Sequence, residues 1–306
     1  MDMNNWEACL AKFKNFLRVE KGLSENSWQS YISDLQKLQG YFEPIGVIPE
    51  KLSTQDLSLF LKEYNELGFS ARSQARLLSS IKNLFTFMEY EEWITENPAT
   101  IIPSPKIPKN LPDTLDLSEI DSMIAAFSPD AKLGLRNRAI LEVLYGCGLR
   151  VSECVDLKIS QILFDDNLIR VKGKGQKERF VPLAPLTTDA IRAYINMDRN
   201  TMEIQPGFED ILFLNRRGKQ LTRVMLFYVV RKAAELAGLQ KVISPHTLRH
   251  SFATHMVQNG ADLRSVQEML GHANLVTTEI YTHLDTQFLR EVVESYHPFG
   301  KKHLGK

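Results

Sequence analysis

The sequence predicts two mainly α-helical domains, with a small antiparallel β-sheet in the second. Apolar residues recur every three or four positions through residues 1–97 and again through 223–295, as on the buried face of a helix. Between these stretches, two β-rich segments flank a glycine-containing turn, and prolines crowd residues 98–112. The chain's 306 residues suffice for two such domains. We therefore expect an N-terminal domain over 1–97, a linker over 98–114 and a second domain over 115–306.

The helices of the first domain have both an apolar stripe and a start signal. One stripe covers residues 28–38, and Ser24 is the expected N-cap of that helix. A second stripe covers residues 77–88, with Ser70 as its cap. Both stripes predict a helical core. The linker is expected because proline stops helices and favours an extended chain; its prolines are Pro98, Pro103, Pro105, Pro108 and Pro112.

The second domain mixes helices with a β-hairpin. An apolar helix over 138–145 is expected to end at residues 146–148, where two glycines flank a cysteine. Residues 168–172 and 178–183 predict a hairpin whose turn is 173–176, and residues 211–214 predict a third short strand. The adjacent Asp165 and Asp166 indicate a turn between strands.

Composition narrows the class of protein. Hydrophobic residues make up 43% and charged residues 24%, as in ordinary globular proteins. No apolar run reaches the roughly 18 residues of a membrane span, so no membrane association is expected. Three cysteines, Cys9, Cys147 and Cys154, are too few and odd in number for a disulfide framework. We therefore expect a reduced, cytoplasmic protein. With 37 basic and 37 acidic residues, only a local basic surface can bind nucleic acid.

Three short segments carry candidate chemistry. Ser244 and Pro245 start a helix on which His246 and Arg249, three residues apart, share a face near the N-terminus, where anions are favoured. Taken alone, that pair can equally be a solvated helix surface.

The other two segments are equally ambiguous when taken singly. Arg150 lies near the start of a second helix, and Glu153, three residues on, can orient it; a surface ion pair is the alternative. Gly271 ends a helix that Asp262 starts, His272 follows it, and Tyr281 comes nine residues later. An isolated tyrosine of this kind is usually a packing residue.

In this order, the three segments resemble the tyrosine recombinase (phage integrase) family, and within it the bacterial Xer recombinases, the group of XerC and XerD. The resemblance covers essentially the whole chain and shows no departure in the motifs. It implies an N-terminal helical bundle (SAM-like) and a C-terminal tyrosine-recombinase catalytic domain. It also implies a support role for Glu153 and a catalytic set of Arg150, Lys174, His246, Arg249, His272 and Tyr281.

The chemistry suits these residue types. A tyrosine hydroxyl has a pKa of about 10 and is a weak nucleophile, but nearby cations favour its phenolate. The planar forks of Arg150 and Arg249 suit the two non-bridging oxygens of an attacked phosphate. Lys174 is the candidate acid for the leaving 5′-hydroxyl, and the histidines can move protons or bind oxygen. Tyr281 would form a 3′-phosphotyrosine that a second 5′-hydroxyl reverses without ATP.

Neither a metal nor another cofactor is expected. The glycines around Lys174 do not match a P-loop, because the lysine precedes Gly175. His246 and His250 have the spacing of a zinc helix, but Thr247 stands where the general-base glutamate would be.

The resemblance further implies double-stranded DNA as substrate, clamped between the two domains. Either these basic residues contact DNA or they are solvated surface: Arg72, Arg76, Lys82, Lys172, Lys177 and Arg179. A tetramer with itself or a second Xer-type recombinase is implied, and so is an FtsK-type DNA translocase as activator. The amphipathic tail over 288–296 is expected to dock into a neighbouring subunit rather than on its own domain.

The implied role is chromosome dimer resolution at a dif-like site, with links to chromosome partition and cell division. An integrase or resolvase of a mobile element would use the same chemistry. A DNA-binding protein without catalysis is an alternative of another class, which the full catalytic set disfavours. The sequence leaves open an XerC-like, an XerD-like or a solitary role.

Overall fold

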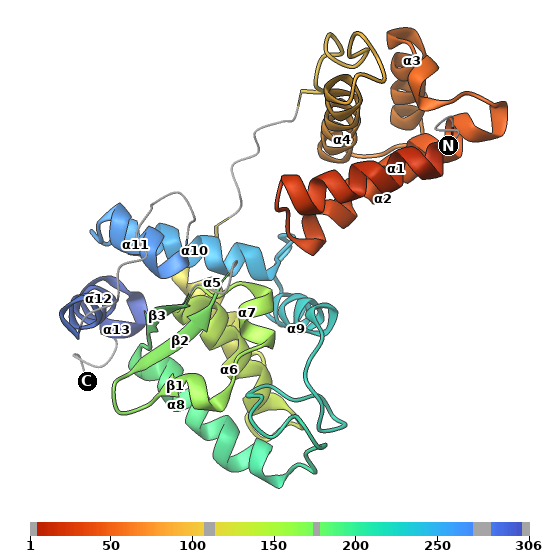
Figure 1. The fold of residues 1–306 in the computed structure, drawn as a ribbon. Helices are drawn as coiled ribbons and strands as arrows, with labels where there is room; N and C mark the ends of the chain where they lie inside the picture. Colours follow the sequence, from red (N-terminus) through yellow and green to blue (C-terminus); the bar gives the residue numbers. More distant parts are fainter. Residues whose placement is uncertain (1–4, 107–113, 174–177, 272–282, 302–306) are drawn as a thin grey trace. The chain divides into compact units, whose positions relative to one another are not determined.

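The computed structural model describes residues 5–106, 114–173, 178–271 and 283–301. Their contacts divide the chain into two compact units, Met1–Asn110 and Leu111–Lys306 (Figure 1). In its described part the first unit contains helices and no strand, and the second combines helices with one antiparallel sheet. The predicted fold class, mainly α with a small antiparallel sheet, is confirmed.

The N-terminal unit packs its helices around one apolar core. Ser24 stands at the N-cap of α2, and the Ser70 hydroxyl accepts from the Ser73 backbone N–H at 3.2 Å to cap α4, so both predicted starts are confirmed. Leu35 and Leu38 from α2 meet Leu77 and Ile81 from α4 in the core. The helices are α1 (Trp6–Asn15), η1 (Phe16–Glu20), α2 (Glu25–Phe42), η2 (Glu43–Ile45), η3 (Pro49–Lys51), α3 (Thr54–Glu66) and α4 (Ala71–Tyr90).

The first residues of the predicted linker pack on this unit. Ala99 and Ile102 are buried in its core. The Thr54 hydroxyl donates to the Pro98 carbonyl at 2.7 Å, and Nζ of Lys82 donates to the Ile102 carbonyl at 2.8 Å. The chain is therefore held against the N-terminal unit as far as residue 102.

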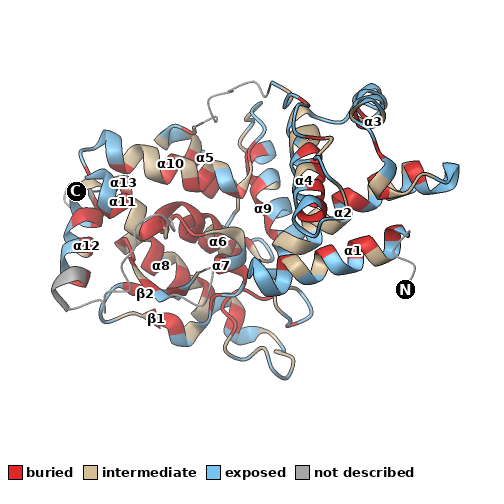
Figure 2. Cartoon of the chain, turned by 45° about the horizontal axis from the view of Figure 1, so that its top comes forward, coloured by how far each residue is buried: buried red, intermediate tan, exposed pale blue. Residues whose placement is uncertain are grey.

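The C-terminal unit is built around α6, which is buried through residues 139–146 (Figure 2). A helix surrounded by other elements has apolar residues on several sides, and residues 139–145 of α6 are apolar except for Glu142. Its helices are α5 (Leu117–Ala125), α6 (Gly134–Gly146), α7 (Val151–Val155), η4 (Ile159–Gln161), α8 (Pro185–Ala193), η6 (Tyr194–Asp198), η7 (Arg199–Thr201), α9 (Arg223–Leu236), α10 (Pro245–Gln258), α11 (Leu263–Leu270), α12 (His283–Tyr296) and α13 (Pro298–Lys301).

The sheet has the order β1–β2–β3, with each neighbouring pair antiparallel. Its strands are β1 (Ile162–Leu163), β2 (Leu168–Lys172) and β3 (Glu178–Pro182). The predicted hairpin and the turn at Asp165–Asp166 are confirmed. The predicted third strand is wrong: residues 211–214 make only isolated bridges. Their apolar side chains are buried, and Arg199 and Arg136 satisfy the carbonyls of Ile211 and Leu214, to which they donate at 2.8 and 2.9 Å.

The C-terminal helix packs on its own unit. Leu289, Val292 and Val293 of α12 are buried in the same core as α6, and Phe299 of α13 joins them. In this single chain the stripe lies on the core of its own unit, and docking of the tail into a neighbouring subunit stays a prediction. Burial of these four apolar side chains removes them from water in the single chain.

Candidate active site

A tight turn between α6 and α7 places Arg150 and Glu153. Gly148 in this turn has a φ of +57°, and a Cβ on it would lie 2.7 Å from Cδ1 of Phe252, so glycine is required here. Arg150 is the N-cap of α7, and its backbone N–H donates to Oε2 of Glu153 at 2.7 Å. The two side chains therefore start from the same helical turn.

Two more arginines reach this point from distant parts of the chain. Arg249 lies on α10, which starts as predicted with Ser244 as N-cap and Pro245 in the first turn. Arg179 lies on β3, opposite Val171 of β2.

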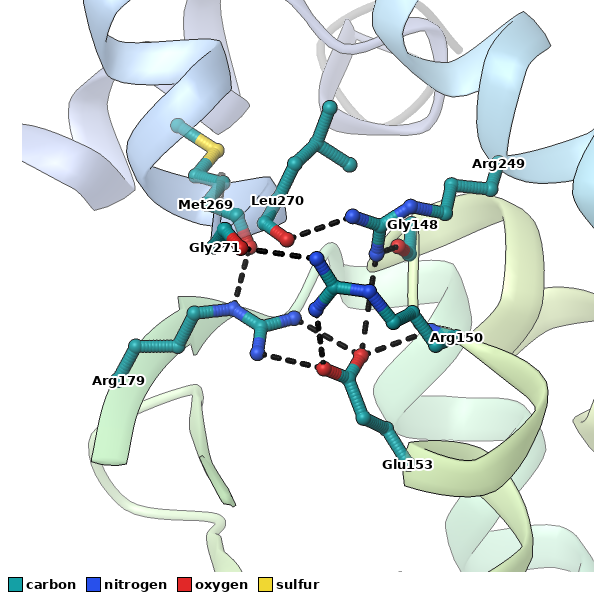
Figure 3. Close-up of polar contacts among 8 residues, drawn as sticks. All are labelled: Gly148, Arg150, Glu153, Arg179, Arg249, Met269, Leu270 and Gly271. Atoms are coloured by element: carbon teal, nitrogen blue, oxygen red, sulfur yellow. Dashed lines mark hydrogen bonds and ion pairs between the residues drawn. The ribbon is translucent and has the colours of Figure 1, made fainter. Parts of the chain in front are cut away.

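The Glu153 carboxylate lies among the three guanidinium groups (Figure 3). Its Oε1 accepts from Nη1 of Arg150 at 2.7 Å and from Nη1 of Arg179 at 2.8 Å. Its Oε2 accepts from Nη2 of Arg179 at 2.9 Å and lies 3.8 Å from Nη1 of Arg249. Arg150 and Arg249, 99 positions apart in the sequence, thus converge on one carboxylate.

Backbone carbonyls complete the orientation of the two predicted phosphate ligands. Nη1 and Nη2 of Arg249 donate to the carbonyls of Gly148 and Leu270, both at 2.6 Å. Nη2 of Arg150 donates to the Gly271 carbonyl at 2.8 Å. The Arg150 side chain is 39% exposed, while those of Arg249 and Glu153 are 7% and 4% exposed. An incoming anion would therefore meet Arg150 at the surface, with Arg249 behind it.

The cluster is electrostatically prepared for an anion. Three guanidinium groups against one carboxylate leave two positive charges in excess. Burial alone would raise the pKa of Glu153, but hydrogen bonds and charge from Arg179, together with those from Arg150, lower that pKa to about 2. Burial and repulsion by Arg150 lower the pKa of Arg249 to about 10. Glu153 and Arg249 are therefore both charged at neutral pH, and a bound phosphate would offset the positive excess of the cluster.

The other predicted catalytic residues are only partly placed. His246 is exposed in the first turn of α10, three residues before Arg249. Lys174, His272 and Tyr281 lie outside the described residues, as does Lys177. In the sequence, Lys174 falls between β2 and β3, and His272 and Tyr281 fall between α11 and α12.

The structure corrects the predicted place of Arg179. It was expected either to contact DNA or to be solvated surface, but it is 5% exposed and its guanidinium is bound to Glu153. The alternation of a strand explains its place, because Arg179 and Val181 share the buried face of β3. The alternation of strand faces along residues 178–183 was visible in the sequence and indicated a buried position for Arg179. Lys172 is exposed, 3.5 Å from Glu178.

Two of the candidate DNA contacts in the N-terminal unit also hold the unit together. Nε and Nη2 of Arg76 donate to the carboxylate of Asp34, both at 2.9 Å, and Asp34 is fully buried. Lys82 donates to the carbonyls of Thr100 and Ile102. Arg72 is exposed on α4.

In residues 5–106, 114–173, 178–271 and 283–301, no three His, Cys, Asp or Glu side chains are grouped closely enough to hold a metal ion. None of the helices there has both the length and the apolar composition needed to cross a membrane.

Glu153→Gln should destabilise the C-terminal unit, because a neutral amide leaves the guanidinium groups uncompensated. A shift of the pKa from 4.5 to about 2 corresponds to about 3 kcal/mol of stability at neutral pH. Because the folded pKa is lowered, this contribution is complete above pH 4.5 and is lost as the pH falls towards 2. Urea unfolding of both proteins at several pH values should show a difference that narrows below pH 4.5.

The matched control is Glu235→Gln, which removes one partner of an exposed ion pair with Lys232 on α9. It should change stability little at any pH. A Glu153→Gln difference that stays constant from pH 7 to 3 would contradict the charge-based account of this carboxylate.

Comparison with known families agrees with this geometry. The chain matches the phage integrase family over residues 113–287 and the phage integrase N-terminal SAM-like domain over residues 10–92. The first match contains Arg150, Glu153, Arg179 and Arg249.

Individual relatives cover nearly the whole chain. Tyrosine recombinase XerD of Chlorobaculum tepidum is 40% identical over 303 residues, which are 96% of this chain and 98% of the relative. XerD of Yersinia pestis is 40% identical over 290 residues, or 94% and 97%. The crystal structure of XerH site-specific recombinase bound to palindromic difH substrate, a post-cleavage complex, matches with a TM-score of 0.70 and 27% identity, over 93% of this chain and 84% of that chain. The chain therefore belongs to the phage integrase family and is a tyrosine recombinase of the Xer type.

Proposed function

We propose that this recombinase cuts and rejoins double-stranded DNA at a dif-like chromosomal site and thereby resolves chromosome dimers. The observation that supports this most is the convergence of Arg150 and Arg249 on Glu153, which makes a partly exposed, positively charged site for one phosphate. The relatives named XerD and the XerH complex with difH favour a dif-like substrate.

In the proposed reaction, the two arginine forks hold the non-bridging oxygens of the scissile phosphate, where charge increases during attack. The Tyr281 hydroxyl attacks phosphorus, and the bond to the 5′-oxygen breaks. Lys174 supplies the proton that the leaving 5′-hydroxyl needs, and His246 and His272 bind oxygen or relay protons. The resulting 3′-phosphotyrosine retains the bond energy, so a 5′-hydroxyl from a second duplex can rejoin the strand without ATP or another cofactor.

The proposed assembly is a tetramer on two duplexes, formed with itself or with a second Xer-type recombinase. An FtsK-type translocase is the proposed activator, and the cytoplasm is the proposed compartment. Since the net charge is zero, local contacts to phosphate would supply the affinity, which should fall steeply with salt.

A nicked duplex tests this function. Cleavage near a nick releases a short fragment and traps the covalent complex. The protein should form that complex on a dif-like site from the chromosome terminus of its own genome and not on a scrambled duplex of equal length. Equal trapping on both duplexes, or trapping only on the ends of a mobile element, would contradict the dif-like assignment.

Lys174→Ala should slow cleavage of an ordinary phosphodiester by about 100-fold or more, as expected for loss of a general acid. The same variant should cleave a substrate with sulfur at the 5′-bridging position at nearly the wild-type rate, because a thiolate leaves without a proton. Single-turnover rates on the two substrates give the comparison. A variant that is equally slow on both would remove Lys174 as the acid.

A further inference from the structure

The C-terminal end of α11 is held by three arginines from three other places in the chain. The carbonyl of Met269 accepts from Nε of Arg179 at 2.7 Å. The next carbonyl, of Leu270, accepts from Arg249, and the one after, of Gly271, accepts from Arg150. Carbonyls at a helix C-terminus lack partners within the helix and attract cations. The position of this helix end therefore depends on the same side chains that form the proposed phosphate site.

Arg179 completes a ring of hydrogen bonds that runs through Glu153, Arg150 and the end of α11 (Figure 3). Both of its terminal nitrogens bind the Glu153 carboxylate, and its Nε binds the Met269 carbonyl. From Glu153 the ring continues through Arg150 to the Gly271 carbonyl, two residues from Met269. Glu153 thus accepts a bidentate pair of hydrogen bonds from Arg179 and one side-chain hydrogen bond from Arg150. Loss of Arg179 would remove one of the two links between Glu153 and the helix end and leave the link through Arg150.

Gly271 lets the guanidinium of Arg179 lie against the backbone. Its φ is +65°, and a Cβ there would lie 3.2 Å from Cδ, Nε and Nη1 of Arg179. A side chain at position 271 would strain the backbone, because φ is positive there, and would also press against the guanidinium of Arg179. The glycine that ends α11 therefore also permits the ring.

Its contacts distinguish Arg179 from the two arginines proposed to hold the phosphate. Arg150 is 39% exposed, against 6% for Arg179. Arg249 is as buried as Arg179, but its terminal nitrogens donate to backbone carbonyls, whereas both of those of Arg179 bind the Glu153 carboxylate. Arg179 also lies on β3, one residue after Glu178, at the hairpin whose turn contains Lys174 in the sequence. A side chain in this place can align other groups without touching DNA.

We propose that Arg179 is a positioning residue for DNA cleavage. It acts through Glu153 and the end of α11, and sets Arg150 and Arg249 at the spacing that one phosphate requires. This inference rests on the proposed function, because the positioning matters only if the arginines hold a scissile phosphate.

The test compares Arg179→Lys with the wild type on the nicked dif-like duplex. A lysine keeps the charge but cannot grip both oxygens of Glu153 and the Met269 carbonyl together. The rate of covalent complex formation at saturating protein should fall by about 100-fold, the effect of misplacing a catalytic group by about 1 Å. The DNA affinity and its dependence on salt should stay near wild type, because no phosphate contact is lost.

A second comparison asks whether Arg179 acts through Arg150. In an Arg150→Lys background, Arg179→Lys should slow cleavage far less than it does alone, because the group it positions is already missing. The matched control is Arg170→Lys, an exposed arginine on β2, which should cleave as the wild type does. If Arg179→Lys does not fold, Gly271→Ala takes its place; it keeps all three arginines and should show the same loss of rate with retained affinity.

Two results would overturn the proposal. One is a folded Arg179→Lys or Gly271→Ala protein that cleaves at the wild-type rate. The other is a loss of affinity and of salt dependence that equals the loss of rate, which would make Arg179 a DNA contact. A wild-type protein that traps no DNA on the nicked duplex would instead overturn the proposed function, and the two failures are thereby distinguished.

Discussion

Tyr281→Phe is expected to bind its DNA site with wild-type affinity and to form no covalent complex on nicked DNA. Only the hydroxyl oxygen is lost, so contacts of the ring and of the DNA backbone persist. Without a nucleophile, the rate of complex formation should fall by about 10⁴-fold or more. Gel mobility shift measures the binding, and denaturing gels measure the covalent complex.

The control for this substitution is Tyr296→Phe, on α12, which removes the same atom from a tyrosine outside the proposed site. It should form the covalent complex at the wild-type rate. A covalent band from Tyr281→Phe would show that another group attacks the phosphate, and loss of binding in that variant would show that the phenol has a different role.

Arg150→Lys should slow cleavage by about 100- to 1000-fold, the effect of losing one donor to a developing oxyanion. DNA affinity should change little, because the positive charge remains and other contacts hold the backbone. The guanidinium of Arg150 donates to Glu153 at 2.7 Å and to the Gly271 carbonyl at 2.8 Å. It also faces solvent. The single nitrogen of a lysine cannot take both partners and a phosphate oxygen as well.

Arg264→Lys, an exposed arginine on α11, is the matched control and should behave as the wild type. Single-turnover cleavage at saturating protein separates rate from affinity. Equal losses in the two quantities for Arg150→Lys would indicate that the arginine binds the ground state of DNA and has no special role in the transition state.

Much of the fold follows from local signals in the sequence. Ser24, Ser70 and Ser244 stand at the helix starts they predict, and Gly271 ends α11 in the left-handed conformation expected of a C-terminal glycine. The hairpin strands also match their predicted bounds within one residue. These features depend on a few neighbouring residues, which a sequence displays directly.

Features that depend on distant partners were harder to predict. The apolar run at residues 211–214 suggested a strand, but Arg136 and Arg199 supply the partners of its carbonyls. The stripe of α12 was expected to pack on a neighbouring subunit, and in the single chain it packs on the core of its own unit. In both cases the competing partner lies far away in the sequence, and no local pattern reveals it.

In the candidate site too, some residues could be predicted from the sequence and others required the folded chain. The order of Arg150, Arg249 and Tyr281 in the sequence, through family resemblance, led to a shared phosphate site, and the structure brings the first two together. Arg179 was assigned to the DNA surface because it lies in a run of cations. Its burial follows from its inward position on β3 and from Glu153 across the site, which only the folded chain shows.

The central claim is that Tyr281 attacks a phosphate held by Arg150 and Arg249. It is tested most directly by identifying the residue that carries DNA in the trapped covalent complex. Digestion with nuclease and protease, followed by mass spectrometry of the adduct peptide, gives that residue and the end of the strand attached to it. The prediction is a nucleotide joined through its 3′-phosphate to Tyr281; attachment to any other residue, or through a 5′-phosphate, would contradict it.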